Sequence, residues 1–135
     1  MPATSIRVTQ PRLLKETAQT LRKLGLSISS SSSPSPLTIT PYPSSGSSHF
    51  PGKVGQSHPT VPPLLVPTST SPARNLSLLR KLATSAPGPF FATGKAGQIN
   101  AALFAAACLA PTHPKIRRAL HRFRSRQTKS VPQKP

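Results

Sequence analysis

The side chains of this sequence that carry charge are almost all cations. Lysine and arginine number 18, and Glu16 is the single acidic residue, which gives a net charge of +17 over 135 residues. A Ser-His-Asp arrangement therefore lacks its acid, and Glu16 alone cannot form the pair of carboxylates that acid–base catalysis often uses. The charge balance predicts that the chain is not an enzyme and has no small-molecule substrate.

The thiol and imidazole groups offer few further candidates for catalysis or metal binding. Cys108 is the single cysteine and lies in an alanine run, where we expect it to be a small buried apolar residue. Cys108, His113 and His121 lack the close pairs that zinc sites use. The segment 94–96 (Gly-Lys-Ala) does not match a phosphate loop, because that motif needs Ser or Thr after the lysine. We expect no catalytic residue, no metal and no cofactor.

The cations are concentrated toward the C-terminal end. Residues 111–135 hold eight of the 18. Arginine grips phosphate through two hydrogen bonds, and arginine-rich segments often fold on RNA. The cluster predicts binding to the phosphate backbone of RNA or DNA, with RNA favoured and little sequence specificity. The predicted contacts are Lys115, Arg117, Arg118, Arg122, Arg124, Arg126 and Lys129, and a secondary basic face comprises Arg12, Lys15, Arg22 and Lys23.

Other readings of the same composition stay open at this point. Basic amphipathic helices also lie on anionic membranes, and the N-terminal segment has the character of a mitochondrial or chloroplast transit peptide. A helper protein docking on the leucine faces is a further possible partner. A Ser/Pro/Arg-rich, acid-poor chain is also typical of an alternative-frame product, either without selected function or acting as a viral accessory protein in silencing suppression or RNA movement. The basic cluster favours the nucleus or nucleolus, with the mitochondrion or a membrane surface as the alternative.

Helical periodicity indicates which segments position these cations. We expect a basic amphipathic helix within residues 1–26, with Pro11 at its first position and Leu13, Leu14, Leu21 and Leu24 on its apolar face. A short amphipathic helix is expected over 73–84. Residues 95–126 are expected to form a helical hairpin with a basic second helix, its helices at about 98–126, followed by a disordered basic tail over 127–135.

The segment 27–72 has a different character. Ser, Thr, Pro and Gly make up 32 of its 46 residues, and ten of them are proline. Proline removes backbone donors and fixes φ, so this composition predicts a disordered linker. The expected fold class is a mostly disordered chain with short α-helices, without a β-sheet and without a single globular core.

Overall fold

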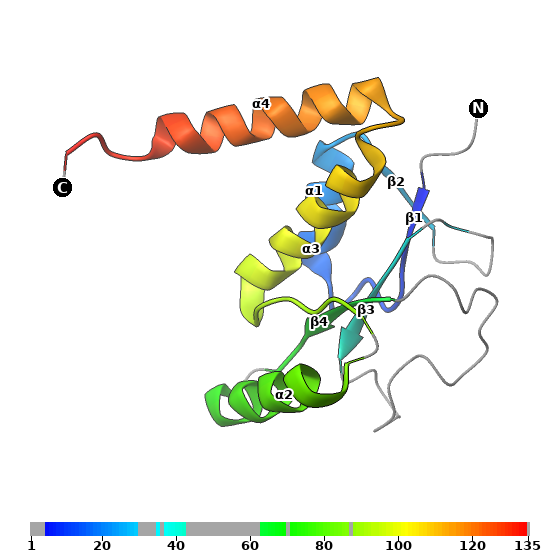
Figure 1. Ribbon diagram of the computed structural model, residues 1–135, viewed down its shortest axis with the longest axis vertical. Helices are drawn as coiled ribbons and strands as arrows, with labels where there is room; N and C mark the ends of the chain where they lie inside the picture. The colour runs from blue at the N-terminus through cyan, green and yellow to red at the C-terminus, as the bar shows by residue number, and fades with distance from the viewer. Residues whose placement is uncertain are drawn as a thin grey trace.

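The chain forms a parallel sheet packed between helices (Figure 1). The computed structural model describes residues 5–29, 35, 37–42, 63–69, 71–86 and 88–134. In this part of the chain the strands are β1 (Ser5–Val8), β2 (Ser27–Ser29), β3 (Thr38–Tyr42) and β4 (Leu64–Pro67), and the helices are α1 (Lys15–Lys23), α2 (Pro72–Ser85), α3 (Gly94–Leu109) and α4 (Pro114–Ser130). The strand order is β2-β1-β3-β4, and all neighbouring pairs are parallel.

The expected fold class is therefore wrong. The protein has an α/β fold with a four-stranded sheet in its described part, and β2, β3 and β4 all lie within the Ser/Pro-rich segment 27–72. The rest of that segment lies mainly outside the described residues, as does Pro135 of the expected tail. Residues 127–130 of the expected disordered tail belong to helix α4.

Proline is compatible with these strands because of where its missing N–H would point. Residue 37, directly before β3, and residue 39 within it bond to the β1 side: Arg7 N–H donates to Leu37 O and Thr9 N–H donates to Ile39 O, each at 3.0 Å. Pro41 follows this alternation toward the side of β1, beyond the paired end of that strand. Its missing donor therefore removes no hydrogen bond to β4, which is why the strand persists through a proline.

The two faces of the sheet build two separate apolar clusters. Ile6, Val8, Ile39, Leu64 and Val66 pack with α1, α3 and the first half of α4. On the opposite face, Tyr42 and Leu65 pack against Leu82 of α2. Alternate residues of β4 thus enter different clusters, as the period of two in a strand requires.

Polar residues occupy the second face of the sheet over β1 and β2. Ile6 and Val8 join the core on one face, so Ser5 and Arg7 lie on the other, and Ser27 and Ser29 flank Ile28 in the same way. The hydroxyl of Ser35 donates to Ser5 O and accepts from Arg7 N–H at 2.9 and 3.1 Å. The connection from β2 to β3 has only eight residues, 30–37, against the dozen or more of a helical crossover. This face of β1 and β2 is polar and needs no helix to cover it. A connection too short to contain a crossover helix is therefore sufficient here.

The N-terminal helix is shorter than the sequence pattern indicates. Residues 10–14 form turns, and α1 begins at Lys15 rather than at Pro11. Leu13 is 44% exposed, whereas Leu14, Leu21 and Leu24 are buried. At the other end Gly25 has a φ of 80°, and Leu26 N–H donates to Leu21 O at 3.0 Å. This left-handed glycine ends the helix and turns the chain into β2.

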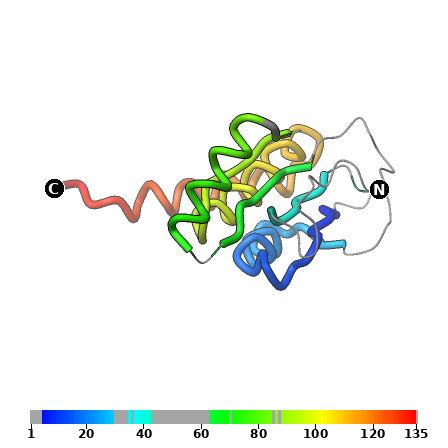
Figure 2. The backbone as a smooth tube through the Cα atoms, turned by 90° about the horizontal axis from the view of Figure 1, so that it is seen from below, coloured from blue at the N-terminus to red at the C-terminus, as the bar shows by residue number. Residues whose placement is uncertain are grey.

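The two C-terminal helices are connected by residues 110–113. The first half of α4 packs on the core through Ile116 and Leu120, with Phe123 half-buried beside them. Beyond this point α4 projects from the body of the molecule (Figure 2). No helix in the described part of the chain is both long enough and apolar enough to cross a lipid bilayer.

Small residues allow α3 to pack closely on the rest of the domain. Ala101, Ala102, Ala105 and Ala106 are all 0% exposed and belong to the core that includes α1. In the first turn, a Cβ on Gly97 would overlap with the backbone carbonyl of Ala92. This position therefore excludes any side chain unless the backbone moves.

Replacing Gly97 by alanine should lower the free energy of unfolding by about 2 kcal/mol or more, because the methyl group has no space and the backbone must shift. Urea denaturation measures this change. Gly94→Ala is the matched control: its φ of 74° strains alanine, but nothing lies within 4 Å of the new methyl group. We expect a cost of about 1–2 kcal/mol for the control. A Gly97→Ala protein as stable as the wild type would contradict the packing described.

Candidate functional site

The carboxyl ends of the parallel strands meet at one edge of the sheet, opposite to α4 (Figure 1). After β1 the chain moves outward to β2, and then crosses back to place β3 on the other side of β1. The strand order therefore reverses between β1 and β3. Open α/β sheets bind their ligands in the crevice outside the strand ends at such a reversal. This edge is the candidate functional site.

The residues immediately after β1 have unusual local features. Gln10 has a φ of 49°, in the left-handed region that residues other than glycine rarely adopt. The Thr9 side-chain hydroxyl is buried, and the described residues provide it with no hydrogen-bond partner. Strained backbone and an unsatisfied buried polar atom concentrate at functional sites. Both features lie at the end of the strand where the order reverses.

The N-terminal turns of α1 and α3 are held together at this edge by one residue. Glu16 N–H donates to Gln98 Oε1 at 3.0 Å, and the Thr17 hydroxyl donates to Gln98 O at 2.8 Å. The N-terminus of a helix carries partial positive charge and unpaired N–H groups, which attract anions. Two such ends therefore lie side by side.

Cations surround these helix ends. Arg12 and Lys15 precede and begin α1, Lys95 lies in the first turn of α3, and all three are exposed. Their charges add to those of the helix ends, so the edge suits a phosphate or a carboxylate.

Other polar residues follow β4 at the same edge. Thr68 N–H donates to Tyr42 O at 2.8 Å, which fixes the end of β4 against the end of β3. Ser71 N–H donates to the hydroxyl of Ser69 at 3.2 Å, directly before α2. Residues 43–62, which include His49 and His58, follow β3 and lie outside the described residues.

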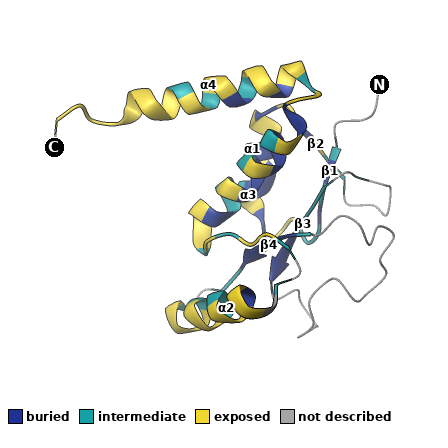
Figure 3. Cartoon of the chain, viewed as in Figure 1, coloured by how far each residue is buried: buried dark blue, intermediate teal, exposed yellow. Residues whose placement is uncertain are grey.

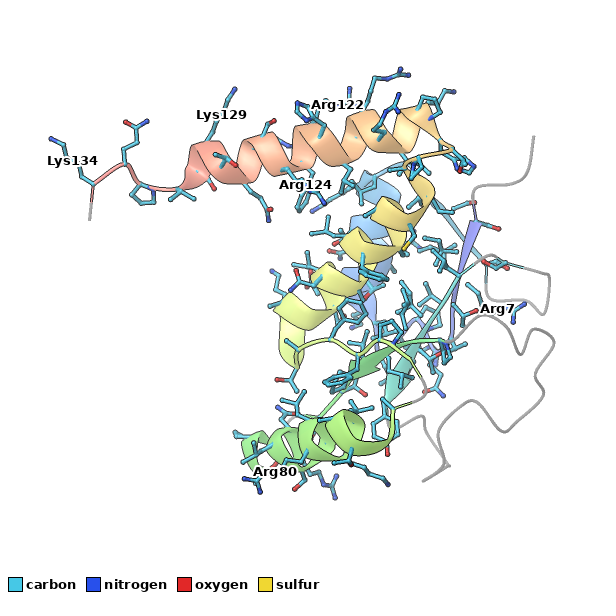
Figure 4. The ribbon with its side chains drawn as sticks, viewed as in Figure 1. Arg7, Arg80, Arg122, Arg124, Lys129 and Lys134 are labelled. Atoms are coloured by element: carbon cyan, nitrogen blue, oxygen red, sulfur yellow. The ribbon has the colours of Figure 1, made fainter. Side chains whose placement is uncertain are left out.

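The seven cations that the sequence indicated as nucleic-acid contacts lie elsewhere. All are exposed on α4, and Arg122 and Lys129 point away from the body of the molecule (Figure 4). At about 100° per residue, five of them fall within an arc of about 80°. This stripe comprises Lys115, Arg118, Arg122, Arg126 and Lys129, while Arg117 and Arg124 lie on the other side of the helix. The structure places none of the seven at the carboxyl edge of the sheet.

The secondary basic face is divided by the structure. Arg12 and Lys15 lie at the start of α1, beside the candidate site, whereas Arg22 and Lys23 lie in its last turn at the opposite end. Sequence reasoning missed Lys95 and Gln98. The available signal was the pair of glycines at 94 and 97 around a lysine at the start of a helix, because such a start can bind an anion without being a complete phosphate loop.

Cys108 is exposed, not buried as the alanine run indicated. No group of three or more His, Cys, Asp or Glu side chains in the described part of the chain is arranged to hold a metal ion.

Two curated proteins resemble this chain in sequence. N5-carboxyaminoimidazole ribonucleotide mutase of Pseudomonas aeruginosa is 35% identical over 96 residues, which cover 68% of this chain and 58% of the mutase. The bifunctional purine synthesis protein purC/E of Dictyostelium discoideum is 32% identical over 128 residues, which cover 93% of this chain and 12% of that protein. The chain thus spans little more than half of the first relative. No family model matches the sequence.

These relatives correct the functional expectations. One is named as a purine synthesis protein, and the other is named as a mutase of a ribonucleotide, which is a small molecule. The expectations of a non-enzymatic accessory protein, of RNA or DNA as the partner and of no small-molecule substrate are therefore wrong. The expectation failed because net charge reports on long-range attraction to anions in general and does not distinguish nucleic acids from smaller anions.

Replacing Gln98 by alanine should lower the free energy of unfolding by about 1–2 kcal/mol, because the side-chain acceptor for Glu16 N–H is lost. Thermal unfolding should show a decrease in Tm of about 3–6 °C. Gln19→Ala, at an exposed position of α1, is the matched control and should change Tm by less than 1 °C. Equal effects of the two substitutions would show that Gln98 does not connect the two helices.

Proposed function

We propose that this chain is an enzyme domain that binds and isomerises a phosphorylated imidazole nucleotide of the N5-carboxyaminoimidazole ribonucleotide type. The observation that carries the proposal is the 35% identity to the mutase over 96 residues. The fold supports it, since the parallel sheet brings two helix N-termini and three cations to the edge where α/β domains bind nucleotides.

The chemistry of such a substrate fits this edge. A ribonucleotide carries a phosphate, and the carboxyamino group adds a second anionic group at neutral pH. Glu16 N–H is already bound by Gln98. The other N–H groups in the first turns of α1 and α3 suit the phosphate, because the first turn of a helix has donors without intrahelical partners and a positive partial charge. Arg12, Lys15 and Lys95 add full charges around them. One anionic nucleotide can therefore be held by backbone donors and cations together.

The role of these residues in the reaction is positioning. A mutase relocates a group within one molecule, so no second substrate has to accept that group. Holding the nucleotide in one orientation contributes directly to the rate of such a reaction. The Thr9 hydroxyl, buried at the end of β1, is a hydrogen-bonding group that the bound nucleotide can satisfy.

The test compares two substitutions that remove the same charge. Lys95→Gln should weaken binding of N5-carboxyaminoimidazole ribonucleotide about tenfold in isothermal titration calorimetry, because one charge-assisted hydrogen bond is lost. Arg126→Gln, on the stripe of α4, should change the affinity by less than twofold. Isomerisation of the same nucleotide, followed by NMR, should be slowed by Lys95→Gln and unchanged by Arg126→Gln.

Two results would contradict the proposal. One is the absence of both binding and turnover with the wild-type chain. The other is an equal loss of affinity in the two variants, which would show that the nucleotide responds to total charge and not to the carboxyl edge.

A further inference from the structure

Helix α4 extends well beyond the part of it that packs on the core. Its last contact with the described core is made by Phe123, which is half-buried. None of residues 124–130 belongs to that core, yet the helix continues to Ser130 and projects from the body of the molecule (Figure 2). Figure 3 shows this part of α4 exposed along most of its length. Because a short helix gains little stability without tertiary packing, the projecting part requires an explanation.

The five-cation stripe of α4 described above places like charges next to one another along the helix. Its members are separated by three, four, four and three residues, so each lies about one turn from the next. Like charges at this separation destabilise a helix. The hydroxyls of Thr128 and Ser130 bring no negative charge, and each donates to a backbone carbonyl of the same helix, at 3.1 and 2.7 Å. The side chains of α4 therefore leave this repulsion uncompensated.

The rest of the chain does not supply an acidic side chain to the stripe. Glu16 is the only acidic residue of the sequence, and it lies in the first turn of α1, at the carboxyl edge opposite to α4 (Figure 1). A second copy of the chain brings the same +17 and the same single acid. Negative charge in quantity therefore has to come from a molecule of another kind.

We propose that the stripe of α4 is a docking surface for an acidic helical segment of another protein. Side chains on one face of a helix recur every three or four residues, so Asp or Glu at these intervals on a partner helix would lie opposite the five cations. Three of the five are arginines, and a guanidinium group holds a carboxylate through two parallel hydrogen bonds. Complementary charges of this kind select the partner and set its register.

Two other classes of polyanion match this surface less well. A helix that lies on a lipid surface buries its apolar face there, but the apolar face of α4 (Ile116, Leu120 and Phe123) is packed on the core. Proteins that hold single-stranded nucleic acid add aromatic side chains on which the bases stack. Phe123 is the only Phe, Tyr or Trp of α4, and it lies on the core side of the helix. An acidic helix needs neither feature.

Fluorescence anisotropy of a labelled peptide mixed with the full chain tests this proposal. The probe is a synthetic helical peptide with Glu at five positions separated by three, four, four and three residues, and its control has the same composition with the Glu residues distributed around the helix. The patterned peptide should bind about fivefold more tightly or better, because only its carboxylates face the stripe together. Its affinity should fall about tenfold or more as salt rises from about 0.05 to about 0.5 M, since exposed ion pairs are screened.

Two double variants separate the stripe from net charge. Arg122→Gln combined with Arg126→Gln removes two cations of the stripe and should weaken binding of the patterned peptide about fivefold or more. Arg117→Gln combined with Arg124→Gln removes the same charge from the other side of α4 and should change the affinity by less than about twofold. Glutamine and arginine have similar helix propensities, and circular dichroism checks that both variants keep their helices.

Equal weakening by the two double variants would overturn the proposal, because binding would then follow total charge. Equal binding of the patterned and redistributed peptides would also overturn it. So would tighter binding of a uridine oligonucleotide or of phosphatidylserine vesicles than of the patterned peptide, at the same concentration of negative charge and with the same dependence on Arg122 and Arg126. That result would assign the stripe to nucleic acid or to a membrane instead.

Discussion

The close packing of α3 on α1 and the sheet is the interaction on which the rest of this structure depends. Four alanines that are 0% exposed allow the approach, and Gln98 ties the first turns of the two helices through Glu16 and Thr17. This packing places both helix N-termini at the carboxyl edge, where an anionic ligand fits.

The sequence alone indicates the helices better than the sheet. Leucine spacing in α2 and the Ile116–Leu120 pair in α4 follow the helical period, which is a local property. The strands have three to five residues, and β4 is buried on both faces and shows no alternation. Parallel pairing also joins residues distant in sequence, such as Ile39 and Leu64. Neither the pairing nor the tolerance of proline in β3 can be read from composition.

The candidate site could be predicted only in part from the sequence, because its residues come together through contacts between segments distant in the chain. Arg12 and Lys15 stood out as cations on a helix, but the pattern grouped them with Arg22 and Lys23, which the structure places at the other end of α1. Lys95 has no cationic neighbour in sequence and becomes part of a cluster only when α3 packs beside α1. The high density of cations in α4 led to a predicted binding site on that helix, which lies at the end of the molecule opposite the strand reversal.

Amide chemical shifts distinguish an anionic nucleotide bound at the carboxyl edge, as we propose, from one bound along α4. On titration with N5-carboxyaminoimidazole ribonucleotide, we expect shift changes at the amides of residues 9–16 and 94–98, with those of 115–129 unchanged. Changes concentrated along residues 115–129, or no changes at saturating nucleotide, would contradict it.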